Sequence, residues 1–149
     1  MKRLAITIDC RSPAALVAFW CAALDYVAEP PPGGFPTWVA YWRSRGIPEA
    51  ELEGAGDEPE SIIDPAGVRP RIWFQSVPES KSVKNRVHLD IDVTDGRSGS
   101  TDERRVRVDA EVARLVALGA QRLRVLAPEG ADYYAVVMCD PEGNEFCVS

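Results

Sequence analysis

The segment from Arg86 to Val93 alternates strictly between polar and apolar side chains. The polar positions are Arg86, His88, Asp90 and Asp92, and the apolar positions are Val87, Leu89, Ile91 and Val93. This alternation is typical of a strand that packs one face and presents the other. His88 is the only histidine in the chain, and it makes the polar face of this strand a candidate functional site.

Hydrophobic periodicity predicts the remaining elements. Residues with strand-like patterns are 4–10, 37–42, 61–63, 71–77, 121–126, 133–139 and 144–149. Bulky residues at helical spacing predict helices over 14–24, opened by Ser12 and Pro13, and over 108–118, ended by Gly119. The inward side chains expected for the second helix are Val108, Val112, Leu115 and Val116.

The polar segments 44–60 and 94–107 are expected to be exposed connections, the first with one helical turn. The second contains Arg104, Arg105 and Arg107 beside acidic residues. We expect these arginines to form a solvated loop of mixed charge rather than a phosphate site.

The two halves of the chain repeat one order of elements. The matching stretches are 8–10 with 91–93, 14–19 with 110–115, and the turn Asp64-Pro65-Ala66-Gly67 with Asp140-Pro141-Glu142-Gly143. We therefore predict an α+β fold in one domain over 1–149, with two pseudo-symmetric βαβββ modules. Module 1 spans about 1–78, a linker 79–84, and module 2 about 85–149, and the modules are expected to form a cupped mixed sheet with the helices outside.

Composition and net charge limit the classes of binding partner and the cellular location that we expect. The net charge is -6, from 17 basic and 23 acidic residues, which argues against nucleic acid and anionic membranes as partners. No apolar run reaches the roughly 18 residues of a membrane span, and the start of the chain does not resemble a signal peptide, so we expect a cytoplasmic protein. The four cysteines lack metal-binding spacing and have apolar neighbours, which predicts buried free thiols.

Several motifs resemble the vicinal oxygen chelate superfamily, which includes glyoxalases, bleomycin resistance proteins and extradiol dioxygenases. They are Phe19-Trp20, the helix end 112–120, Asp140-Pro141-Glu142-Gly143-Asn144, and 73–79 together with 84–90. The last pair is most similar to the glyoxalase-like domain branch, and the resemblance covers nearly the whole chain. It implies a cup that takes a small-molecule ligand, and a homodimer.

The resemblance also implies where a metal would bind, because members that do chemistry hold a divalent ion on the first and last strands of each module. Matching the two halves assigns these positions to Ala5, Gln75, His88 and Cys147. Ala5 offers no donor atom, Gln75 offers a neutral oxygen, and Cys147 suits softer metals. We therefore expect no metal ligands and no cofactor, with a divalent metal at an altered site as the alternative.

The expected ligand-binding residues are Trp73, Gln75, His88, Asp90, Glu145 and Cys147. His88 is the one candidate catalytic residue, since imidazole can accept or donate a proton near neutral pH. The alternative for His88 is an ordinary polar strand residue, and Trp73 either stacks on a flat ligand or packs in the core.

Two functions remain open from the sequence. The one that the missing metal ligand favours is a protein that binds a small organic molecule without chemistry, as bleomycin-resistance relatives do. The other is a lyase, isomerase or dioxygenase-type enzyme that uses His88 or an altered metal site. Whether the chain is an enzyme is not decided by its residues.

Overall fold

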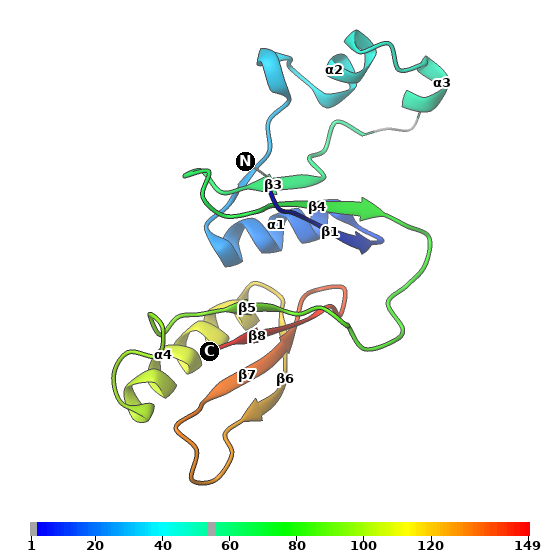
Figure 1. Cartoon of the computed structure of the whole chain (residues 1–149). Helices are drawn as coiled ribbons and strands as arrows, with labels where there is room; N and C mark the ends of the chain where they lie inside the picture. The colour runs from blue at the N-terminus through cyan, green and yellow to red at the C-terminus, as the bar shows by residue number, and fades with distance from the viewer. Residues whose placement is uncertain (1–2, 54–55) are drawn as a thin grey trace. The chain divides into compact units, whose positions relative to one another are not determined.

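The computed structural model describes residues 3–53 and 56–149, which divide into two compact units (Figure 1). The first unit ends at Pro78 and the second begins at Glu79. Each unit has its own sheet and its own packed helix, so each is described by itself.

The first unit is a four-stranded mixed sheet with one long helix. Its elements are β1 (Ala5–Cys10), α1 (Pro13–Leu24), β2 (Val27–Ala28), β3 (Ser61–Ile63) and β4 (Arg71–Ser76). The strand order is β1-β4-β3-β2, with β1 parallel to β4 and the other pairs antiparallel. A 3₁₀ turn (Pro32–Gly34) and two short helices, α2 (Trp38–Ser44) and α3 (Glu49–Leu52), are inserted between β2 and β3.

The second unit repeats this topology. Its elements are β5 (Leu89–Ile91), α4 (Thr101–Ala117), β6 (Gln121–Leu126), β7 (Ala135–Cys139) and β8 (Glu145–Val148). The order β5-β8-β7-β6, again with only the first pair parallel, matches the first unit strand for strand. The predicted α+β class and the pseudo-symmetric βαβββ modules are therefore confirmed.

In the last strand of each unit, β4 and β8, buried side chains alternate with more exposed ones. In β4, Ile72 and Phe74 are fully buried, and α1 packs against β3 and β4. Since successive strand residues point to opposite faces, Arg71, Trp73 and Gln75 lie on the face away from this core. The face of β8 with Glu145 and Cys147 is likewise half-buried, between the buried positions Phe146 and Val148.

The repeated Asp-Pro-x-Gly turn has a structural explanation. The Asp64 carboxylate accepts hydrogen bonds from the main-chain N–H groups of Ala66, Val68 and Arg69 and from the Arg69 guanidinium. Asp140 accepts from the main chain of Glu142 and Asn144 in the second unit. The repeat therefore shapes the loop before the last strand of each unit.

The predicted strand over 37–42 is wrong, because this segment begins helix α2. The Thr37 hydroxyl accepts the N–H of Ala40 and caps the helix at 3.0 Å. Trp38 and Trp42 are four residues apart, so their alternation fits a helix face equally well, and their rings stack with centroids 5.9 Å apart. The second strand of the first unit is instead β2.

The predicted loop over 94–107 is also wrong in its second half, because α4 begins at Thr101. Ser100 and Glu103 form a reciprocal capping box at its start. Arg104, expected in solvent, is 5% exposed and donates to Asp132 and to the carbonyl of Gly99.

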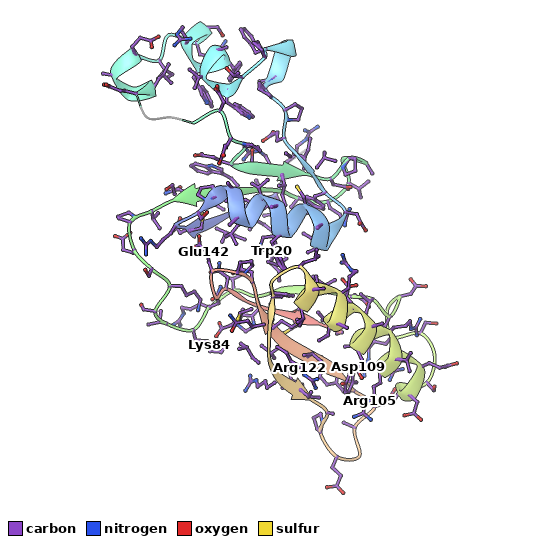
Figure 2. All side chains as sticks on the ribbon, turned by 180° about the vertical axis from the view of Figure 1, so that it is seen from behind. Trp20, Lys84, Arg105, Asp109, Arg122 and Glu142 are labelled. Atoms are coloured by element: carbon purple, nitrogen blue, oxygen red, sulfur yellow. The ribbon has the colours of Figure 1, made fainter. Side chains whose placement is uncertain are left out.

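The rest of α4 follows the prediction with one exception. Val108, Val112 and Leu115 are buried, but Val116 is 47% exposed and does not face the core. Arg105 and Asp109, both on α4 (Figure 2), contact Tyr134: the guanidinium lies 4.7 Å from the ring centroid and the carboxylate accepts the hydroxyl at 2.6 Å.

The strand around His88 is shorter than predicted. Only Leu89 to Ile91 pair as β5, and Val87, expected on the packed face, is 77% exposed.

All four cysteines are free thiols, of which Cys10 and Cys139 are buried and Cys21 and Cys147 are half-buried. Within residues 3–53 and 56–149, no helix has the length and apolar character to cross a membrane.

Candidate functional site

The hydrogen-bonded registers show which residues of the two units occupy equivalent positions. Counting back from the Asp-Pro-x-Gly turns, Ser61 pairs with Trp73 in the first unit and Val137 pairs with Cys147 in the second. Trp73 is therefore the counterpart of Cys147, and Arg71 of Glu145. The sequence matching of Gln75 with Cys147 is wrong by two residues, because the loop before β4 exceeds that before β8 by two residues rather than four.

The first strands extend this correspondence. Thr7 pairs with Trp73, and Asp90 pairs with Cys147, so Thr7 and Asp90 are counterparts. Two residues earlier, Ala5 pairs with Arg71. His88 directly precedes β5, and extending the β5–β8 register by one residue places it level with Glu145. The matching of Ala5 with His88 thus agrees with the register.

His88 lies among polar groups of the second unit. Its Nε2 is 2.8 Å from the Nζ of Lys84, a residue labelled in Figure 2, and 3.2 Å from the carbonyl oxygen of Asn85. Glu145 accepts the main-chain N–H of Asn85 at 2.6 Å and lies 4.0 Å from Lys81 and 3.9 Å from Lys84. That main-chain bond first, and then the two lysines and His88, lower the pKa of Glu145.

Cys147 and Asp90 are adjacent on the same sheet. Partial burial first, and then the neighbouring Asp90 carboxylate, raise the pKa of the Cys147 thiol. A raised pKa keeps the thiol protonated at neutral pH, and only the thiolate is a good nucleophile or metal ligand. Cys147 therefore lacks the lowered pKa that marks a reactive thiol.

The residues do not fit the divalent metal site that the family resemblance implies. In the second unit the two positions are held by His88, directly before β5, and Glu145 on β8, which offer a nitrogen and a carboxylate. The counterparts in the first unit are Ala5, a methyl group, and Arg71, a cation held by Glu29 at 2.6 Å. In the described part of the chain, no three His, Cys, Asp or Glu side chains come together in a way that could hold a metal ion.

A cavity of about 390 Å³ lies in the first unit, over the sheet face opposite α1. We call it the tryptophan pocket. Its lining residues are Trp38, Val39, Trp42, Gly56, Glu58, Glu60, Ser61, Arg71 and Trp73. The strands β3 and β4 supply one side, the inserted helix α2 supplies another, and the segment before β3 supplies the two glutamates.

Hydrogen bonds fix the walls of the tryptophan pocket. The indole N–H of Trp38 donates to the main-chain oxygen of Glu29 at 3.2 Å, and that of Trp73 donates to the Glu60 carboxylate at 3.5 Å. One carboxylate oxygen of Glu29 accepts both from Arg71 and from the Ser61 hydroxyl, each at 2.6 Å. The pocket is therefore largely preformed, as small-molecule sites usually are.

The sequence-predicted site residues fall into two groups. Trp73 lines the tryptophan pocket, and Gln75 lies on the same sheet face, paired in register with Asp9. The others belong to the second unit, where Asp90 lies on β5, Glu145 and Cys147 lie on the neighbouring β8, and His88 directly precedes β5. None of these four residues is among the described residues that line the tryptophan pocket.

Sequence reasoning missed most of the tryptophan pocket. The predicted ligand-binding residues do not include Trp38, Trp42, Glu58, Glu60, Ser61 and Arg71. A signal was present, because the segment 32–60 carries two tryptophans and a tyrosine at helical spacing and is far longer than the loop between β6 and β7, its counterpart in the repeat.

Comparison with known proteins agrees with this architecture. A family described as "Glyoxalase-like domain" matches residues 5–149. A search of curated proteins finds no match.

Several solved structures share the fold. A glyoxalase/bleomycin resistance protein/dioxygenase family enzyme from Burkholderia phytofirmans is 19% identical, with a TM-score of 0.57 over 97% of this chain and 94% of that one. A mutant of the fosfomycin resistance protein FosX from Listeria monocytogenes, complexed with Mn(II) and 1S,2S-dihydroxypropylphosphonic acid, is 13% identical, with a TM-score of 0.58 over 99% and 89%. A glyoxalase-related enzyme from Fulvimarina pelagi is 18% identical, with a TM-score of 0.54 over 99% and 87%.

Proposed function

Since the chain belongs to the glyoxalase-like domain family of the vicinal oxygen chelate superfamily, we propose that it binds a small organic molecule in the tryptophan pocket without the superfamily's usual metal site. The observation that carries the proposal is the cavity itself. Its volume of about 390 Å³ falls in the range of ligand pockets, roughly 300–1,000 Å³. Aromatic side chains with a few fixed polar groups are the usual lining of such a site, and here three indole rings supply the aromatic part.

The metal-free part of the proposal depends on the first unit. A metal that acts as a Lewis acid needs several converging N or O donors and an open position. Ala5 and Arg71 occupy the first-unit positions where those donors would be needed. Arg71, which stands at one of these positions, also lines the tryptophan pocket.

A fragment screen read by NMR tests the proposal. The chain has four indole N–H groups: Trp38, Trp42 and Trp73 line the pocket, whereas Trp20 is buried in α1 and serves as an internal control. We expect fragments that bind to shift the three pocket resonances and to leave that of Trp20 in place. Fragments that bind without moving the pocket resonances, or a library without hits, would overturn the proposal.

The polar cluster of the second unit supports a second candidate, an enzyme of the same superfamily that uses His88 as acid and base. Lys84 can donate to Nε2 only when that nitrogen carries no proton, while the Asn85 carbonyl accepts from Nε2 only when it does. His88 thus has a partner for either protonation state of this nitrogen, which is what a proton-transferring histidine needs. Two of the solved structures that share the fold are described as enzymes, which supports this second candidate.

The family resemblance adds a homodimer to the proposal. A mass measurement on the purified protein tests it. We expect about twice the 16.3 kDa of one chain, and a particle of a single chain's mass would contradict this expectation.

A further inference from the structure

We propose that the ligand of the tryptophan pocket is an organic cation, a quaternary ammonium or protonated amine attached to a flat ring. This inference rests on the proposed function of the pocket and adds the chemical class of the ligand. Two independent features of the lining carry it, the indole rings and the balance of charge.

The indole rings offer their faces rather than their N–H groups. Trp38 and Trp73 direct their N–H groups to acceptors of the protein, the main-chain oxygen of Glu29 and the carboxylate of Glu60. What these two residues leave for a ligand is ring surface. The face of an indole carries negative electrostatic potential and attracts cations more strongly than the ring of tyrosine or phenylalanine does.

The stacked pair on α2 extends this surface. The rings of Trp38 and Trp42 lie 5.9 Å apart between centroids with an interplanar angle of 27°. Trp42 remains 42% exposed although it lines the pocket, so its ring is available to a ligand. Together with Trp73 on β4, these rings form an aromatic lining on two sides of the cavity.

The charges of the lining favour a cation. Glu58 and Glu60 are exposed carboxylates, and the one cationic side chain in the lining is Arg71. Arg71 is already paired with Glu29 at 2.6 Å, and that carboxylate also accepts from Ser61. Among the described lining residues, the carboxylates of Glu58 and Glu60 therefore have no free cationic side chain beside the three indole rings. A negatively charged ligand would meet these carboxylates with its only cationic partner already engaged.

Three para-substituted phenols of matched shape test the inference. One carries trimethylammonium, one carries the neutral isosteric tert-butyl group, and one carries sulfonate. Affinity is measured by titration of the full chain, with the indole resonances of Trp38, Trp42 and Trp73 locating the probe. We expect the ammonium compound to bind at least tenfold more tightly than the tert-butyl compound, and the sulfonate to bind most weakly.

A variant that removes two negative charges tests the contribution of the Glu58 and Glu60 carboxylates to the preference for a cation. In a Glu58→Gln and Glu60→Gln double variant, we expect the preference for the ammonium probe to fall several-fold while the affinity for the tert-butyl probe stays the same. The unchanged neutral probe also shows that the pocket is still folded. Glu51→Gln removes an exposed carboxylate of α3 that does not line the pocket and should leave all three affinities unchanged.

The outcomes separate this inference from the proposed function. Equal binding of the ammonium and tert-butyl probes, or tightest binding of the sulfonate, would overturn the cation assignment and leave the pocket as a small-molecule site. Failure of all three probes to shift the pocket resonances would count against both.

Discussion

At the scale of single residues, Asp64 is the clearest case of chemistry that serves the fold. Its carboxylate accepts from three main-chain N–H groups and from Arg69. The Arg69 side-chain bond first, and then the main-chain bonds, hold the pKa of Asp64 well below its usual value. An ionised Asp64 is therefore part of the native loop before β4.

Replacing Asp64 changes how stability depends on pH. Because the folded-state pKa is depressed, the unfolded chain binds more protons below about pH 4, and the contribution of Asp64 is lost as the pH falls from there toward the folded-state pKa. We expect Asp64→Asn to be less stable than the parent at pH 7 and to lose less stability on acidification below about pH 4. Urea unfolding at several pH values measures both.

Asp95 offers the matched control, because its side chain is exposed and Asn tolerates its positive φ of 53°. Asp95→Asn should follow the parent curve. Parallel pH profiles for the parent and Asp64→Asn would show that the carboxylate of Asp64 does not contribute as described.

The turn that begins at Asp64 shows which part of the fold the sequence could predict. The turn Asp64-Pro65-Ala66-Gly67 and its repeat at Asp140 were visible as a motif and correctly predicted loops. The number of residues between the turn and the next strand determines which position of β4 corresponds to which position of β8. The sequence match of the two halves differs from the observed loop lengths by two residues, so it places Gln75 where the structure has Trp73.

At the scale of elements, α4 shows how a short polar motif determines where a helix begins. Periodicity of apolar residues located the helix from Val108 onward, but its first two turns are polar and looked like a loop. The capping box of Ser100 and Glu103 satisfies main-chain N–H groups at the true start. The buried Arg104 then anchors this end to Asp132.

Removing the cap tests this account. Ser100→Ala deletes the hydroxyl that accepts the N–H of Glu103, and we expect it to lower the free energy of unfolding by about 1 kcal/mol. Chemical denaturation measures the loss. Ser98→Ala is the control, because Ser98 bonds to Arg107 through its main-chain oxygen, and it should change stability little. An equal effect of both substitutions would contradict the role of the cap.

Helix α2 shows the limit of periodicity over short runs. The pattern of residues 37–42, with its two tryptophans, fits either a strand or a helix. The Thr37 cap and the stacking of Trp38 on Trp42 stabilise the helix. Neither contact can be inferred from alternation alone. The misassigned element is the one that builds a wall of the tryptophan pocket, so the pocket was missed with it.

At the scale of the whole molecule, the repeat predicted the fold class, and divergence between the units determines the candidate sites. The two sheets share strand order and direction, yet equivalent positions carry Ala5 and His88, Arg71 and Glu145, or Trp73 and Cys147. One unit therefore has the aromatic pocket and the other has the histidine cluster. The residues of the histidine cluster could be predicted from the sequence, because His88 and Asp90 are two residues apart, as are Glu145 and Cys147.

Metal titration tests the consequence of this divergence. We expect no stoichiometric binding of Mn, Fe, Co, Ni or Zn ions at micromolar concentration, since the first-unit positions offer a methyl group and a cation instead of donors. Metal analysis after dialysis measures the content. One ion per chain in the parent protein that disappears in His88→Ala would contradict this and favour the enzyme candidate.

The most direct test of the central claim is calorimetric titration of the best fragment hit into the parent protein, Trp42→Ala and His88→Ala. We predict one site per chain in the parent, affinity at least tenfold weaker in Trp42→Ala, and no change in His88→Ala. The first substitution removes an exposed ring of the tryptophan pocket, and the second alters only the cluster of the second unit. Binding that survives Trp42→Ala and is lost in His88→Ala would place the ligand at His88 and contradict the claim.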